Sequence, residues 1–175
     1  GVHHQAPVPE YHSSTMRKRV APLAEATAPI EPVAAGNTKG KVALYVTCYG
    51  NYNTPHLGED FATVFGHNGI HIELVPKEAC CGMPKLELGD LEAVDKAKET
   101  NIPVLAKLVD EGWDIVAPIP SCGLMFRQEL PLMYPDDPDV AKVAAAIYDP
   151  FEYLMLRHKH ELLNTDFKAP LGKVA

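Results

Sequence analysis

The sequence has no long apolar run, few cysteines and fewer basic than acidic residues. No stretch reaches the roughly 18 consecutive apolar residues that a membrane-spanning helix needs, so we expect no transmembrane segment. The 175 residues include 16 Lys and Arg against 23 Asp and Glu, which gives a net charge of −7. Because contacts with a phosphate backbone need clustered cations, we expect no nucleic-acid partner. The basic cluster Arg17-Lys18-Arg19 is interpreted as solvated tail charge, with a weak contact to anionic lipid as the alternative.

The four cysteines of the chain are Cys48, Cys80, Cys81 and Cys122. Four is too few for a scaffold stapled by disulfides, and the adjacent Cys80 and Cys81 would form a strained disulfide with each other. The first residues lack the charged region and apolar core of a secretory signal. We therefore expect a cytoplasmic, reducing setting in which the thiolates are free to bind metal. Any contact with the inner face of a membrane would come through a partner.

The character of the sequence changes at about residue 40. Residues 1–40 carry five prolines among many alanines and show no sustained periodicity, which predicts an extended arm or linker. From residue 41 onward, short apolar runs alternate with amphipathic segments. The expected strands are 42–47, 70–75 and 113–118. The expected helices are 57–68, 90–111 with an interruption or kink near Pro103, 123–132, 140–148 and 151–163, and residues 172–175 look like the opening of a further strand.

Alternation of strands and helices is typical of an α/β fold with a mostly parallel sheet, flanking helices and Rossmann-like connections. In such folds ligands bind beyond the carboxyl ends of the strands. Each of the four cysteines comes shortly after a predicted strand, in what we expect to be a loop. The sequence therefore predicts that the four thiols meet at one edge of the sheet.

Thiolates are the preferred ligands of iron–sulfur clusters, zinc and copper(I). Adjacent cysteines can hold two different irons of a cluster, and Gly82 lets the backbone pass close to a bulky inorganic core because it has no Cβ. A zinc finger would show two closely spaced cysteine pairs, which this chain lacks. The residues thus predict an iron–sulfur site, with zinc at the same cysteines as a competing interpretation. A thiol–disulfide site that uses Cys80 or Cys81 with Cys48 or Cys122 is a third.

Three motifs carry a resemblance to a known family. They are the segments 48–53 (CYGNYN), 80–84 (CCGMP) and 120–123 (PSCG). Together they resemble the cysteine-rich CCG domain, which occurs in the B subunit of heterodisulfide reductase and the C subunit of anaerobic glycerol-3-phosphate dehydrogenase. The resemblance covers about residues 41–175, so residues 1–40 are assigned to the arm and residues 41–175 to the CCG domain.

The resemblance implies a cluster of the 4Fe-4S type held by Cys48, Cys80, Cys81 and Cys122. It also implies electron transfer between a dehydrogenase or ferredoxin-like partner and a quinone or a disulfide. The fullest family motif ends in Cys-x-x-Cys, whereas Ile119 stands three residues before Cys122 here. Family members usually contain two repeats, so a second CCG repeat is an expected partner. The alternative is a non-catalytic zinc-binding interaction module built on the same cysteines.

Overall fold

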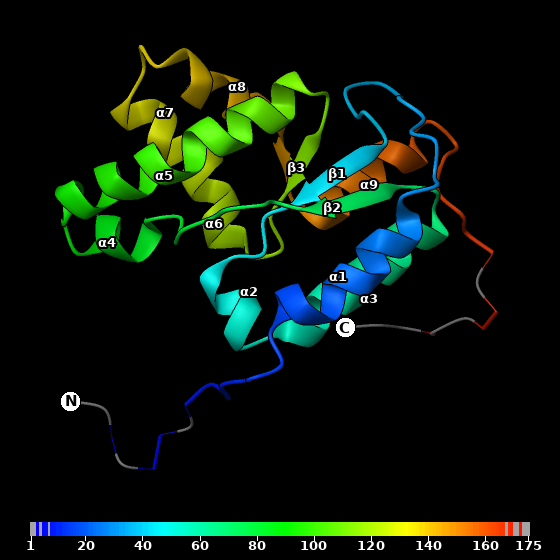
Figure 1. Ribbon diagram of the computed structural model, residues 1–175, viewed down its shortest axis with the longest axis horizontal. Helices are drawn as coiled ribbons and strands as arrows, with labels where there is room; N and C mark the ends of the chain where they lie inside the picture. The colour runs from blue at the N-terminus through cyan, green and yellow to red at the C-terminus, as the bar shows by residue number, and fades with distance from the viewer. Residues whose placement is uncertain (1–2, 4, 7, 167, 170–171, 173–175) are drawn as a thin grey trace.

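The fold is organised around a four-stranded parallel sheet (Figure 1). The computed structural model describes residues 3, 5–6, 8–166, 168–169 and 172. The strands lie in the order β2-β1-β3-β4, so the chain leaves β1 toward one edge and then returns to pair β3 with the other side of β1. Their bounds are Lys41–Leu44 for β1, His71–Leu74 for β2, Asp114–Val116 for β3 and Ile147–Tyr148 for β4. These features confirm the predicted α/β class with a parallel sheet.

The strands are short because each is a brief run of apolar residues between turns. Both faces of the central strand are buried, as expected for a parallel sheet covered on two sides. Val42, Leu44 and Val46 pack into one hydrophobic cluster, whereas Ala43 and Tyr45 pack into the other. The alternation of side chains along β1 therefore divides the core into two halves.

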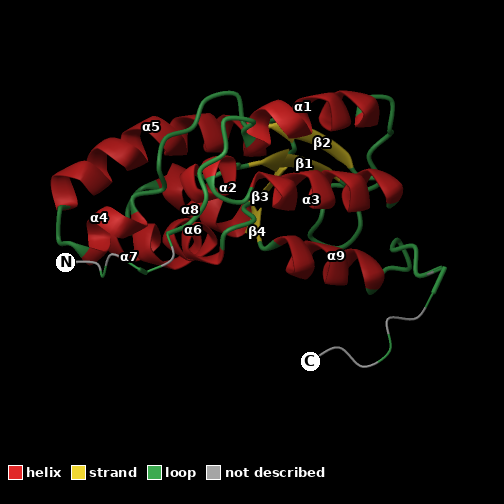
Figure 2. Ribbon diagram, turned by 90° about the horizontal axis from the view of Figure 1, so that it is seen from below, coloured by secondary structure: helices red, strands yellow, loops and turns green. Residues whose placement is uncertain are grey.

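Two layers of helices cover the sheet (Figure 2). One face is covered by α1 (Met16–Thr27), α3 (Pro55–His67) and α9 (Pro150–His158). The other face is covered by α5 (Leu91–Asp110), α6 (Pro120–Leu124), the π-helix η1 (Met125–Glu129), α7 (Leu130–Met133) and α8 (Pro138–Ala146). Two short helices lie next to cysteines in the sequence: α2 (Cys48–Tyr52) begins at Cys48, and α4 (Met83–Glu87) begins two residues after Cys81. In the described part of the chain, no helix combines the length and the hydropathy of a membrane span.

Local signals in the sequence place several helix ends correctly. Gly69 adopts a φ of 69° directly after α3, where a left-handed residue ends the helix at little cost. Asp90 caps α5 by accepting a hydrogen bond from the backbone N–H of Ala93 at 3.2 Å. The same helix runs without interruption through Pro103, so of the predicted interruption or kink near that residue, the interruption is wrong.

The segment before β1 departs from the expectation of an arm without regular structure. Residues 16–27 form α1, and the side chains of Met16 and Val20 in it are fully buried. A Cβ on Gly58 of α3 would lie 2.3 Å from Cγ of Met16, so this glycine permits the close approach of the two helices. The prolines and alanines that suggested a linker thus conceal an amphipathic helix whose apolar face completes the core.

Two further differences lie toward the C-terminus. The predicted helix 140–148 ends at Ala146, and residues 147–148 form β4, which pairs with β3. The predicted helix 151–163 begins at Pro150 and ends at His158. Of the predicted strand opening at 172–175, residues 173–175 lie outside the described residues.

Thr27 at the end of α1 protects the exposed edge of β2. β2 pairs with β1 on one side only, and the backbone N–H of Ile72 faces the unpaired side. This N–H donates to the Thr27 hydroxyl at 2.9 Å. The same hydroxyl lies 3.3 Å from the Ile72 carbonyl oxygen. Because both residues are buried, water cannot replace these bonds. α1 therefore covers an edge that would otherwise be a template for pairing with another chain.

Replacing Thr27 with Val should lower the free energy of unfolding by about 1–3 kcal/mol, because the buried N–H of Ile72 loses its acceptor while side-chain volume is retained. Thr27→Ser is the matched control, since it keeps the hydroxyl. Denaturant unfolding of both variants measures the difference. Equal stability of the Val and Ser variants would contradict this role of the hydroxyl.

Candidate metal centre at the carboxyl edge of the sheet

The four cysteines lie beyond the carboxyl ends of three strands. Cys48 follows β1, Cys80 and Cys81 follow β2, and Cys122 follows β3. The prediction that all four stand in loops is wrong for two of them: Cys48 is the first residue of α2 and Cys122 lies within α6. This edge is also where the strand order reverses around β1, the position at which doubly wound sheets bind their ligands.

The thiols form an outer pair and an inner pair. In the outer pair, the Sγ atoms of Cys48 and Cys80 are 3.9 Å apart, and Cys48 is exposed. In the inner pair, Cys81 and Cys122 are each only 4% exposed and share a hydrogen bond, and the Cys81 thiol also interacts with that of Cys80, which joins the two pairs. The structure therefore brings together the four residues that the sequence singled out, with one pair facing solvent and the other enclosed.

The cysteines perturb one another's ionisation. The hydrogen bond from the Cys122 thiol, helped by a backbone N–H bond at Met83, lowers the pKa of Cys81 to about 7 against the effect of burial. That same hydrogen bond, together with burial and the charges of Cys81, Cys48 and Cys80, raises the pKa of Cys122. Burial, the largest cause, raises the pKa of Cys80 to about 11. The thiols of Cys80, Cys81 and Cys122 therefore lie close enough to affect one another's pKa.

The donor set is sulfur-rich but is not arranged around a single point. Among the residues that the structure describes, no three His, Cys, Asp or Glu side chains converge closely enough to hold one metal ion. Gly82, which follows the inner Cys81, adopts a φ of 96° and turns the chain sharply into α4. Four thiols in two pairs, beside a glycine turn, fit the chemistry of a cluster with several irons.

The loop that carries Cys80 and Cys81 is held by two buried side chains. Asn101 of α5 accepts a hydrogen bond from Ala79 N–H at 2.8 Å and donates to the Cys80 carbonyl at 3.1 Å. From the other side, the Tyr45 hydroxyl donates to the Ala79 carbonyl. Burial, followed by the charges of Cys81 and its neighbours, raises the pKa of Tyr45, so the hydroxyl remains a donor. The backbone next to the cysteines is thus satisfied from both β1 and α5.

Sequence reasoning missed both of these side chains. A signal was available for Asn101, because this amide stands on the apolar face of α5 with Val94 and Leu105 and is only 1% exposed. A polar residue at a core position must find a hydrogen-bonding partner. Tyr45 carried no such signal, since a tyrosine in an apolar strand is ordinary. Among the large side chains that follow the cysteines in the sequence, Met83 is buried, whereas Tyr49 and Tyr52 are exposed.

Thr47, the residue before Cys48, has a strained backbone. Its φ of 68° and ψ of 155° lie in a region that is essentially reserved for glycine. The side chain offsets part of the cost by accepting a hydrogen bond from Gly50 N–H at 2.9 Å, which caps α2. This conformation makes the chain turn abruptly from β1 into α2 and places Cys48 at the start of that turn.

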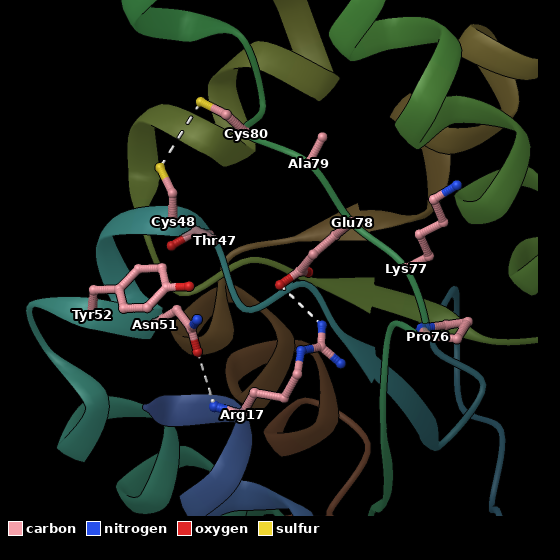
Figure 3. Close-up of a pocket in the computed structure, with 10 residues that line it drawn as sticks. All are labelled: Arg17, Thr47, Cys48, Asn51, Tyr52, Pro76, Lys77, Glu78, Ala79 and Cys80. Atoms are coloured by element: carbon pink, nitrogen blue, oxygen red, sulfur yellow. Dashed lines mark hydrogen bonds and ion pairs between the residues drawn. The ribbon is translucent and has the colours of Figure 1, made fainter. Parts of the chain in front are cut away.

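A cavity of about 440 Å³ opens beside the outer pair (Figure 3). Cys48, Cys80, Glu78 and Arg17 are among its lining residues. Arg17 and Glu78 form an ion pair at 3.0 Å, and burial raises the pKa of the Glu78 carboxyl while the Arg17 charge opposes that rise. Arg19, in the same basic cluster, pairs with Glu59 at 3.0 Å. The interpretation of the cluster as solvated tail charge is therefore wrong for these two arginines.

Comparisons with known proteins identify the class of the domain. Residues 42–127 match the family model described as the CCG cysteine-rich domain, and the chain contains a domain of this family. This match includes all four cysteines, and α1 lies outside it.

Two relatives extend the similarity beyond that region. The chain is 29% identical over 131 residues to the C subunit of anaerobic glycerol-3-phosphate dehydrogenase from Escherichia coli (strain K12), covering 74% of this chain and 31% of the relative. It is 32% identical over 136 residues to lactate utilization protein A 1 from Bacillus cereus (strain AH820), covering 77% of this chain and 54% of the relative. The chain thus spans about a third of the first relative and about half of the second. No solved structure matches it.

Replacing Asn101 with Ala should lower the free energy of unfolding by about 1–3 kcal/mol, because Ala79 N–H and the Cys80 carbonyl lose their buried partner. Thr100→Ala is the matched control on the same helix, since the Thr100 hydroxyl bonds only to Lys96 O at the surface. Denaturant unfolding measures both. A loss no larger than that of the control would show that Asn101 does not hold the loop.

The strain at Thr47 predicts that Thr47→Gly is more stable than Thr47→Ala by about 1 kcal/mol. Glycine relieves the positive φ, whereas alanine keeps the strain and also loses the hydroxyl that caps α2. Thermal unfolding of the two variants, followed by circular dichroism, tests this order. If the alanine variant unfolded at the higher temperature, Thr47 would not be strained in the folded protein.

Proposed function

We propose that this chain is an iron–sulfur electron-transfer domain of an oxidoreductase. The observation that carries the proposal is the meeting of Cys48, Cys80, Cys81 and Cys122 at one edge of the sheet, from three separate strand ends. The membership of residues 42–127 in the CCG family supports it. The similarity to a dehydrogenase subunit and to a lactate utilization protein also supports it.

The four cysteines would hold a cluster of the 4Fe-4S type. When bound, such a group accepts and gives up single electrons at a potential set by its ligands, hydrogen bonds and exposure. The inner pair of Cys81 and Cys122 would anchor the buried side of the cluster, and the outer pair of Cys48 and Cys80 would hold the side that faces solvent. Asn101 and Tyr45 would hold the loop that supplies Cys80 to the outer pair and Cys81 to the inner pair.

Zinc at the same cysteines is the second candidate, as a non-catalytic interaction module. A single zinc ion holds each sulfur at about 2.3 Å, so four ligands must lie within roughly 4 Å of one another. The outer pair satisfies that spacing at 3.9 Å, but the described residues include no group of three ligands placed to hold one ion. We therefore rank zinc behind a cluster, which spreads its cysteine ligands over several irons.

A domain of this kind needs partners on both sides of the electron path. We propose a dehydrogenase or ferredoxin-like protein on one side and a quinone or a disulfide on the other. The chain spans 31% and 54% of the two relatives, which leaves room in such proteins for a second CCG repeat. Residues 41–175 as the domain, a cytoplasmic location and attachment to the inner face of the membrane through a partner stay predictions.

Metal analysis and an absorption spectrum of protein purified without oxygen test the proposal directly. We expect iron and sulfide in cluster stoichiometry and a broad visible absorption that dithionite bleaches. Stoichiometric zinc with a featureless visible spectrum would establish the interaction module instead, because zinc is redox-inert.

Replacing Cys81 with Ser should abolish cluster binding, since it removes an enclosed ligand that no solvent molecule can readily replace. Ser121→Ala, an exposed change next to Cys122, is the control that should keep full iron content. Iron, sulfide and the visible spectrum are measured on both purified variants. A Cys81→Ser protein with full iron and an unchanged spectrum would refute the ligand assignment.

A further inference from the structure

Arg17 joins the N-terminal helix to the cysteine edge. Its guanidinium pairs with Glu78 at 3.0 Å, and its backbone N–H donates to Oδ1 of Asn51 in α2 at 3.1 Å. Figure 3 shows the guanidinium directed at Glu78, on the cavity that the outer cysteine pair also lines. One residue of α1 therefore contacts the segment that follows β1 and the segment that follows β2.

Glu78 is the link between Arg17 and the cysteine loop. Its carboxylate accepts a hydrogen bond from Val46 N–H at 2.9 Å, and its side chain is only 13% exposed. A carboxylate this buried needs a cation beside it to remain charged. Paired with Arg17, the Glu78 side chain ties the chain two residues before Cys80 to Val46, which follows β1. Without that guanidinium, Glu78 would lose the partner that holds it against Val46.

The charge of Arg17 also acts on the outer pair. Reduction of a cluster adds one negative charge, so a nearby cation stabilises the reduced state and a nearby anion destabilises it. Arg17, Cys48 and Cys80 line the same cavity, in which Arg17 and Glu78 are a cation and an anion of opposite effect. Their two contributions to the reduction potential should therefore differ in sign.

We propose that Arg17 is a positioning residue of the redox centre, so that the N-terminal helix is part of that centre. Arg17 holds Glu78 and the cysteine loop in place, and its positive charge raises the reduction potential of the cluster. The inference rests on the proposed function where it concerns the cluster. It goes beyond the family match, because α1 precedes residues 42–127.

The reduction potential tests the electrostatic part. Dye-mediated titrations with dithionite are run on the wild type, Arg17→Ala, Arg17→Lys, Glu78→Gln and Arg19→Ala at equal iron content. We expect a lower potential for Arg17→Ala, a potential near that of the wild type for Arg17→Lys, and a higher potential for Glu78→Gln. A loss of packing alone would not produce shifts of opposite sign.

Arg19→Ala is the matched control. Arg19 stands on the same turn of α1 and makes an ion pair of the same 3.0 Å length, but its partner is Glu59 and it does not line the cavity. We expect no change in potential for this variant. Equal potentials for Arg17→Ala and Arg19→Ala, or shifts of the same sign for Arg17→Ala and Glu78→Gln, would overturn the electrostatic role.

Hydrogen exchange at the Val46 amide, followed on the protein as purified, tests the positioning part. Arg17→Ala should speed this exchange by roughly tenfold, because the acceptor Glu78 is no longer held, whereas Arg19→Ala should leave it unchanged. Unchanged exchange in Arg17→Ala would overturn the positioning role. A wild-type protein without iron would refute the proposed function, while the exchange experiment would still decide whether Arg17 holds the loop.

Discussion

The site depends on how the backbone around Cys80 and Cys81 is held. This loop crosses the carboxyl edge of the sheet beneath α5, where its N–H and C=O groups cannot all reach water. Asn101 and Tyr45 supply the missing hydrogen bonds from α5 and β1. Because thiols attract one another only weakly, the cysteines come together through these polar contacts and through the sheet, not through their own affinity.

The two ends of α1 have different roles: one end stabilises the fold and the other contributes to the site. Thr27 at its last turn covers the edge of β2, and Arg17 at its first turn reaches Glu78 beside the outer cysteines. Met16 and Val20 of the same helix complete the core on that face of the sheet. One helix therefore contributes both to the packing of the sheet and to the wall of the cavity, although it lies outside the CCG match.

The sequence allowed the sheet and the cysteine edge to be predicted because both depend on local signals. Apolar runs give the strands, Gly69 and Asp90 mark helix ends, and parallel strands bring their carboxyl ends together. α1 was missed because its apolar face is spaced among alanines and Pro22, and β4 because two residues carry no periodicity. The partners of Asn101 and Arg17 lie far along the chain, so no local pattern reveals them.

Because the two cysteine pairs differ in burial, the proposed redox centre has one side open to solvent and one side enclosed by the core. Cys81 and Cys122 are enclosed by the core, so in the proposed function electrons would have their shortest route to a partner through Cys48 and Cys80. The same outer side holds the cavity, the strained Thr47 and the one ion pair of the cavity wall that the structure describes. In the proposed function the two sides would have separate tasks: the inner side would retain the cluster, and the outer side would set its potential and its access. Residues that set the properties of this site apart from those of other proteins with the same four cysteines are therefore expected on the outer side, where Arg17 of α1 lines the cavity.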